Sequence, residues 1–153
     1  MRPEPTQRLA GVARGYWALQ GAAAGLAAFV LSEVVGDDLG DTAATLLPLA
    51  ALLVLVVGVA VVPALRWRRW RWEVRDVEVD LRHGLLTEVR TIVPMSRVQH
   101  VEVQRSLLGQ LFGVSTVAVH TAAGEVEIPA LPEAAAALVR DRIADLAQEP
   151  DDL

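Results

Sequence analysis

Two uninterrupted apolar stretches constrain this chain more than any other feature of its sequence. Residues 15–35 carry a single charge, Glu33, and residues 46–65 carry none. At a rise of about 1.5 Å per residue, a helix over either stretch crosses the roughly 30 Å hydrocarbon core of a bilayer. The sequence therefore predicts a two-helix transmembrane hairpin over residues 15–65, with a short acidic loop at 36–45, and excludes a purely soluble fold.

The charges that flank the hairpin predict its orientation. Residues 1–14 have a net charge of +2 and residues 66–72 one of +4, whereas the loop has −3. Because Arg-rich flanks stay on the cytoplasmic side, we expect a multi-pass protein of the cell membrane with both termini in the cytoplasm. A cleaved signal peptide is the alternative for the first stretch, but its apolar run is longer than such peptides have.

Within the first stretch, Gly21 and Gly25 form a G-x-x-x-G step. Small residues at this spacing let two helices approach closely. The partner is either the second stretch of the same chain, which the short loop favours, or a second copy of the chain. Glu33 lies near the outer loop, where we expect its carboxylate to reach water.

A basic segment that alternates arginine with tryptophan follows the hairpin. Cations and amphipathic rings beside a span favour the headgroup region, so we interpret the segment as a membrane-interface anchor. Such residues can also bind nucleic acid. However, residues 73–153 carry a net charge of −7, which would repel a phosphate backbone, and we expect no nucleic-acid partner. The anchor residues are Arg66, Trp67, Arg68, Arg69, Trp70 and Arg71.

Residues 72–148 are predicted to form one cytoplasmic domain. Apolar and polar residues alternate in short runs, which indicates six strands. A short helical insert at 107–113 interrupts them, and an amphipathic helix at 132–148 ends the domain. The predicted strands centre on residues 70–74, 77–81, 89–93, 97–103, 117–121 and 126–128, and the apolar helix face is Ala135, Leu138, Val139, Ile143 and Leu146. Residues 149–153 are predicted to be a tail.

These elements define an α+β membrane protein. Six short strands at this spacing predict a strongly bent antiparallel sheet or barrel, capped at one end by the C-terminal helix. The change from even to odd apolar positions requires a turn near residues 75–76, and further turns are expected at 83–84 and 123–124.

Residues 94–132 carry a combination of features that resembles one family. Pro94 precedes an Arg-Val-Gln triplet at 97–99, then a Leu-rich step that ends in Gly113, a valine strand and a Thr-Ala-Ala-Gly turn at 121–124. With the hairpin before it, this combination resembles the YdbS-like bacterial pleckstrin-homology (PH) membrane proteins. The resemblance implies a PH-like barrel of about seven strands with a C-terminal helix, and it brings no catalytic motif.

Motifs for catalysis are absent from the sequence. The chain has no cysteine, no G-x-S-x-G, no H-E-x-x-H and no Walker-type glycine loop, so we expect neither an enzyme nor a cofactor. His100, Glu102 and His120 could share one face of a sheet as metal ligands. Surface imidazoles are the favoured interpretation, and no metal site is predicted.

Two functions from different classes remain. The first is a non-enzymatic, membrane-anchored scaffold that binds a protein partner, itself or a larger PH-domain membrane protein. Its candidate interaction surface is Arg97, Gln99 and His100, although a structural Arg97 paired with a backbone carbonyl is favoured over a recognition role.

The second function is lipid-headgroup binding or membrane sensing. Phosphate recognition needs clustered cations, whereas the seven arginines of residues 73–153 are dispersed among 14 acids. The sequence therefore favours the scaffold. A basic pocket facing the membrane would favour the lipid function instead.

Overall fold

The computed structural model describes residues 3–148, which form two compact units. The helical unit comprises residues 14–65. The sheet unit combines residues 3–13 with residues 66–148, so it is built from the two pieces of chain that flank the hairpin. The predicted tail at 149–153 lies outside the described residues.

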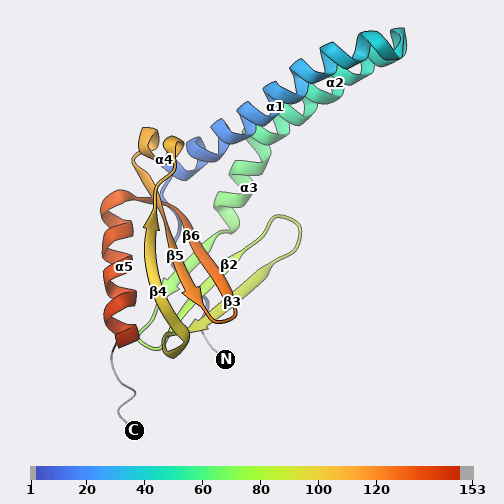
Figure 1. The fold of residues 1–153 in the computed structure, drawn as a ribbon. Helices are drawn as coiled ribbons and strands as arrows, with labels where there is room; N and C mark the ends of the chain where they lie inside the picture. Colours follow the sequence, from blue (N-terminus) through green and yellow to red (C-terminus); the bar gives the residue numbers. More distant parts are fainter. Residues whose placement is uncertain (1–2, 149–153) are drawn as a thin grey trace. The chain divides into compact units, whose positions relative to one another are not determined.

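Long apolar helices form the helical unit (Figure 1). Two stretches, Val12–Gly36 and Asp41–Arg69, are long and apolar enough to cross a membrane, and little of either is buried inside the protein. The helices continue into the region predicted as a loop, which leaves Gly40, with a φ of 94°, as the turn. The helical elements are α1 (Val12–Leu39), α2 (Asp41–Val56), the π-helical turn η1 (Val57–Val61) and α3 (Val62–Arg69).

Glycines let the two helical runs approach each other closely. A Cβ atom on Gly21 would lie 2.2 Å from the carbonyl oxygen of Gly58, and one on Gly25 would lie 2.7 Å from Cα of Leu55. These separations are too short for any side chain, so the glycines are required for the contact. The structure confirms that the G-x-x-x-G step packs within the chain.

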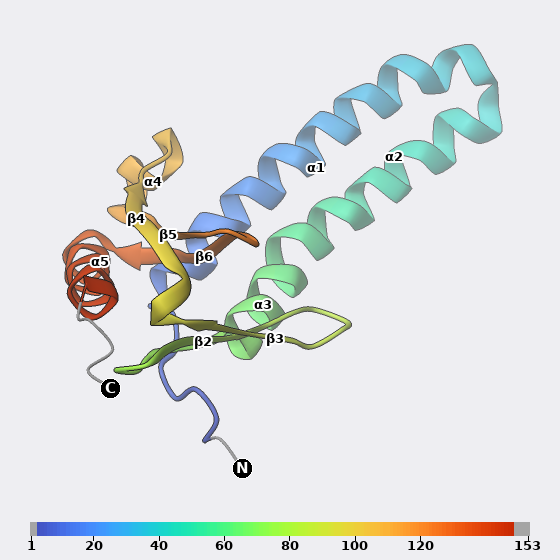
Figure 2. The ribbon, with the colours of Figure 1, turned by 60° about the horizontal axis from the view of Figure 1, so that its bottom comes forward.

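Two three-stranded antiparallel sheets make up most of the sheet unit (Figures 1 and 2). The first has the order β1-β2-β3 and the second the order β4-β5-β6. The strands are β1 (Arg71–Val74), β2 (Glu78–His83), β3 (Val89–Pro94), β4 (Val98–Gln104), β5 (Val114–Thr121) and β6 (Gly124–Pro132). The six predicted strands are confirmed among the described residues, and the predicted turns separate β1 from β2, β2 from β3, and β5 from β6.

Three short or helical elements connect and cover the sheets. The 3₁₀ turn η2 (Met95–Arg97) leads the chain from the first sheet to the second, and α4 (Leu107–Phe112) lies between β4 and β5. The C-terminal α5 (Glu133–Gln148) packs against β1 and against all three strands of the second sheet. The fold is therefore a bent pair of sheets capped by a helix, and the described strands do not close into a barrel.

The core contains apolar side chains from both sheets and α5. Val79 and Leu81 on β2, Val117 on β5 and Ile143 on α5 are almost completely buried, as the strand and helix periodicities predict. The predicted helix face is wrong at one position, because Leu138 is 71% exposed and Ala136 is buried.

The N-terminal residues 3–13, predicted to be a separate cytoplasmic segment, pack on the sheet unit. Gln7 and Trp72 exchange two backbone hydrogen bonds, of 3.2 and 3.0 Å. Leu9 is 2% exposed. Because this segment contributes one bridge and no strand, the seventh strand implied by the family resemblance is not found among the described residues.

A buried carboxylate lies close to the N-terminal segment. Asp80 is fully buried on β2 and accepts two hydrogen bonds from Arg90, of 3.0 and 2.6 Å. Arg75 lies 3.3 Å from the same carboxylate. Both arginines also donate to the carbonyl oxygen of Pro3, at 2.8 and 2.9 Å, so this ion-pair cluster holds the start of the chain against the first sheet.

Candidate functional site

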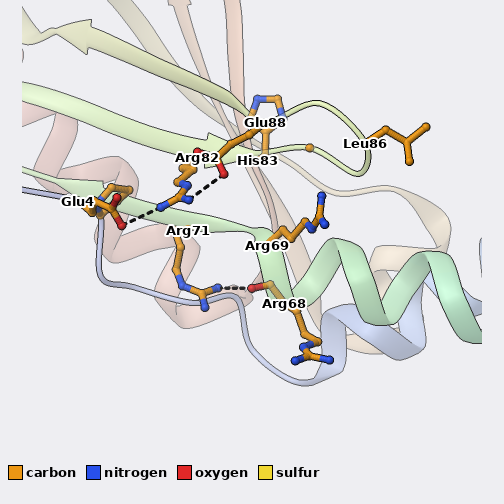
Figure 3. A pocket seen from close by; sticks show the side chains of 10 residues that line it. Glu4, Arg68, Arg69, Arg71, Arg82, His83, Leu86 and Glu88 are labelled. Atoms are coloured by element: carbon orange, nitrogen blue, oxygen red, sulfur yellow. Dashed lines mark hydrogen bonds and ion pairs between the residues drawn. The ribbon is translucent and has the colours of Figure 1, made fainter.

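An open pocket in the sheet unit is lined mainly by arginines (Figure 3). It has a volume of about 570 Å³ and is bounded by the end of α3, the first two strands, the β2–β3 turn and the N-terminal segment. Four arginines face two carboxylates around it. The charged lining residues are Arg68, Arg69, Arg71, Arg82, Glu4 and Glu88.

The strand register brings two of these cations together. Arg71 on β1 lies directly opposite Arg82 on β2. Like charges at opposed positions of an antiparallel pair repel each other, so this arrangement needs anions nearby. Arg82 obtains them from Glu4 and Glu88, each bound at 2.7 Å.

The pKa values of two pocket arginines shift in opposite directions. The hydrogen bond with Glu88 is the main cause of the raised pKa of Arg82, and the same bond lowers the pKa of Glu88. The pKa of Arg71 is instead lowered, first by burial and then by repulsion from Arg8 and Arg82. The glutamates thus stabilise the charge of Arg82, whereas Arg71 is less favourably placed.

Two pocket arginines also hold the backbone around the pocket. Arg71 donates to the carbonyl oxygens of Arg68 and Trp70, at 2.8 and 2.7 Å. Arg69 donates to the carbonyl oxygen of Leu85 in the β2–β3 turn.

Arg68 is different from these arginines, because its guanidinium has no hydrogen-bond or ion-pair partner among the described residues. In Figure 3 its side chain points away from the other labelled groups. Arg68 is therefore an exposed cation at the edge of the pocket, available to an external anion.

The predicted anchor residues do not all lie on the surface. Trp70 is buried and stacks on His83, with 4.6 Å between ring centroids, and Arg66 lies over its ring at 5.9 Å. Trp67 donates from Nε1 to the carbonyl oxygen of Leu9 at 2.8 Å. The tryptophans thus contribute to the packing of the sheet unit, whereas Arg68 and Arg69 are exposed.

Burial lowers the pKa of His83, and repulsion from Arg66 lowers it further. The imidazole is therefore neutral at pH 7, and the positive charge of the pocket comes from its arginines.

The other predicted surface, Arg97, Gln99 and His100, is exposed. Arg97 lines two shallow grooves of about 280 and 440 Å³, one beside β3 and one beside Gln99. Among the described residues its guanidinium has no hydrogen bond to a backbone carbonyl, and a structural role for Arg97 stays a prediction. The structure also brings together His100, Glu102 and His120.

The arginine pocket was missed because the cations were considered turn by turn along the sequence. Its members come from α3, β1 and β2, and only the three-dimensional fold makes them neighbours. The hairpin register was the available signal, since a turn at residues 75–77 places Arg71 opposite Arg82. Arg82 is the one pocket cation from the seven arginines of residues 73–153, and the other three belong to the basic segment 66–71 predicted as the anchor.

The chain has two helices that are apolar enough to span a membrane. A PH-like pair of sheets and a C-terminal helix follow them, and this combination defines a membrane-anchored PH-like protein. Comparison with known families agrees with this class. Residues 22–147 match the model of the bacterial PH domain, and the chain belongs to the bacterial PH domain family.

Two proteins of Bacillus subtilis (strain 168) are similar to the chain. Transmembrane protein YdbS is 41% identical over 101 residues, which cover 66% of this chain and 64% of YdbS. Transmembrane protein YdbT is 26% identical over 93 residues, 61% of this chain and 19% of YdbT. The chain thus spans less than two thirds of either relative, and no solved structure matches it. The apolar helices and these relatives identify a membrane-associated protein.

Proposed function

We propose that this protein is a non-enzymatic, membrane-anchored PH-like module that binds anionic lipid headgroups in its arginine-lined pocket. Four arginines and two glutamates line one cavity of about 570 Å³, and this imbalance of charge is the observation that carries the proposal. Guanidinium groups bind phosphate oxygens through paired, charge-assisted hydrogen bonds. The sequence favoured a scaffold because the arginines of residues 73–153 are dispersed. Around this cavity Arg82 joins three arginines of the basic segment 66–71, and we therefore prefer the lipid function.

Chain connectivity supports a ligand at the membrane surface. Arg68 and Arg69 follow Leu65, the last residue of the second apolar stretch, by three and four residues. At about 1.5 Å per helical residue, they lie roughly 5–6 Å further along α3, within the headgroup layer of a bilayer that α2 and α3 cross. An anionic headgroup is therefore the phosphate compound closest at hand.

In this proposal both termini, and with them the pocket, lie in the cytoplasm. The arginine-rich flanks of the hairpin and the three aspartates next to its turn support this orientation. A reporter fused after Leu153 should report the cytoplasm and one inserted at Gly40 the outside. Two reporters on one side would contradict the hairpin topology.

The lipid proposal can be tested on the full chain in detergent micelles. Native mass spectrometry would count short-chain phosphatidylglycerol and phosphatidylcholine molecules bound per protein. We expect one saturable phosphatidylglycerol site, little phosphatidylcholine binding, and weaker binding as salt rises. Arg68→Gln removes one cation that makes no internal bond. It should weaken phosphatidylglycerol binding about fivefold, because a cation near an anionic surface contributes about 1 kcal/mol.

Arg140→Gln is the matched control, since Arg140 is exposed on α5 and pairs with its neighbour Asp141. It should leave lipid binding unchanged. Equal binding of both lipids, or equal effects of the two substitutions, would contradict a headgroup site in the pocket.

A scaffold function is the second candidate, and the exposed surface around Arg97 supports it. Arg97 and Gln99 are exposed beside two grooves, and β3 pairs with β2 only, which leaves its other edge open to an added strand among the described residues. A photo-crosslinking amino acid at Gln99 should capture one defined protein, or a second copy of the chain, in native membranes. The same probe at the exposed Leu138 is the control, and identical captures from both positions would contradict the scaffold.

A further inference from the structure

Three potential metal ligands meet on one face of the second sheet. His100 on β4 lies directly opposite His120 on β5, and their rings are stacked with centroids 4.1 Å apart and planes 11° from parallel. Glu102 lies two residues along β4, which places its side chain on the same face. One ligand atom from each residue lies within 4.8 Å of those of the other two.

One of the ligand–ligand distances already matches that around a bound zinc ion. Zinc bonds of about 2.0–2.2 Å in tetrahedral geometry place neighbouring ligand atoms roughly 3.3–3.5 Å apart. Nε2 of His120 already lies 3.3 Å from Oε1 of Glu102. His100 is exposed, so rotation of its side chain brings its nitrogen into range without movement of the sheet backbone.

A neighbouring side chain orients one of the three ligands. Gln104 donates to Oε1 of Glu102 at 2.6 Å, which fixes the carboxylate. On the other side of the His120 ring, Oε2 of Glu125 lies 4.0 Å from Nδ1, close enough to add negative charge beside the imidazole but too far for a hydrogen bond.

From this geometry we infer that His100, Glu102 and His120 form a binding site for a divalent transition metal, with zinc as its ligand. Two imidazoles and one carboxylate suit zinc, whereas magnesium and calcium prefer ligand sets made only of oxygen. Three protein ligands leave a fourth position for water or for a donor from a bound partner. The sequence favoured unliganded imidazoles. The stacked pair of histidines across two strands, with the oriented carboxylate of Glu102 beside it, now favours a metal site instead.

The test uses the full chain without an affinity tag, in detergent and stripped of metal with a chelator. Zinc titration against a chromogenic chelator should show one site per chain with a dissociation constant of about 10 μM or below. His100→Asn and Glu102→Gln should each weaken zinc binding at least about tenfold. Both replaced side chains are partly or fully exposed, and circular dichroism would verify that the variants fold.

His83→Asn is the matched control, because His83 is the remaining histidine of the chain and lies on β2, away from the cluster. Its zinc affinity should equal that of the unsubstituted chain. Visible absorption by bound Co²⁺ should disappear in the His100 variant and persist in the His83 variant. The absence of saturable binding up to about 100 μM zinc would overturn the site. So would equal losses in the His83 and His100 variants, or binding that neither His100→Asn nor Glu102→Gln changes.

Discussion

Replacing Leu9 with alanine tests whether the N-terminal segment is an integral part of the sheet unit. Leu9 is 2% exposed, and its backbone carbonyl accepts a hydrogen bond from Trp67. Truncation of a buried leucine to alanine costs about 2–5 kcal/mol. Because a terminal segment can detach without unfolding the sheets, we expect the lower part of this range, about 2–3 kcal/mol, as a loss of local stability.

Hydrogen exchange measures this loss at two identified amides. The amide groups of Gln7 and Trp72 bond to each other's carbonyl oxygens, so both become accessible when the segment detaches. A loss of about 2–3 kcal/mol corresponds to exchange about 30 to 150 times faster. Protection of Val79 and Val117 in the core should change little.

Leu138→Ala is the control for the loss of a leucine side chain as such. Leu138 is 71% exposed, so its truncation should change stability by less than about 0.5 kcal/mol. If Leu9→Ala accelerated exchange at Gln7 and Trp72 by no more than Leu138→Ala does, the packing argument for residues 3–13 would be refuted.

Three further predictions concern other parts of the chain. Gly21→Leu should lower the melting temperature in detergent, since its side chain would overlap the backbone of Gly58, whereas Gly11→Leu, with no atom within 4 Å of the added Cβ, should not. Burial lowers the pKa of His83 in the folded protein. The stabilisation from the neutral imidazole is therefore complete above about pH 6.5 and is lost as the pH falls below that value. In thermal melts from pH 7 to 5, the melting temperature should fall less for His83→Gln than for the unsubstituted chain. Gly113→Ala should destabilise the protein by about 1 kcal/mol in denaturant titrations, because residue 113 ends α4 with a φ of 64°.

Most of the fold could be predicted from local patterns. Alternation of apolar and polar residues places the strands, because successive side chains of a strand point to opposite faces. Gly84 and Gly124, both with positive φ, mark turns that the sequence indicates directly. Ser106 and Gly113 bound the short α4 as an N-cap and a left-handed C-cap.

The remainder depends on contacts between residues far apart in the chain. Residues 3–13 contain two prolines and no repeating pattern, so nothing local indicates that Leu9 is buried or that Gln7 pairs with Trp72. The arginine pocket likewise needs α3, the β1–β2 register and Glu4 at once. Leu138 was placed on the buried helix face because helical spacing gives a stripe but does not say how wide its covered part is.

The sheet unit is assembled from both flanks of the hairpin, and this imposes an order on biosynthesis. Residues 3–13 leave the ribosome before the two apolar helices, whereas their backbone partner in β1 is made only after both. The two hydrogen bonds between Gln7 and Trp72 can form only when the two flanks emerge on the same face of the bilayer. A chain threaded through the membrane once would keep Leu9 apart from its partners and leave the first sheet incomplete. Completion of the sheet unit therefore requires the residues before and after the hairpin to lie on one side of the bilayer.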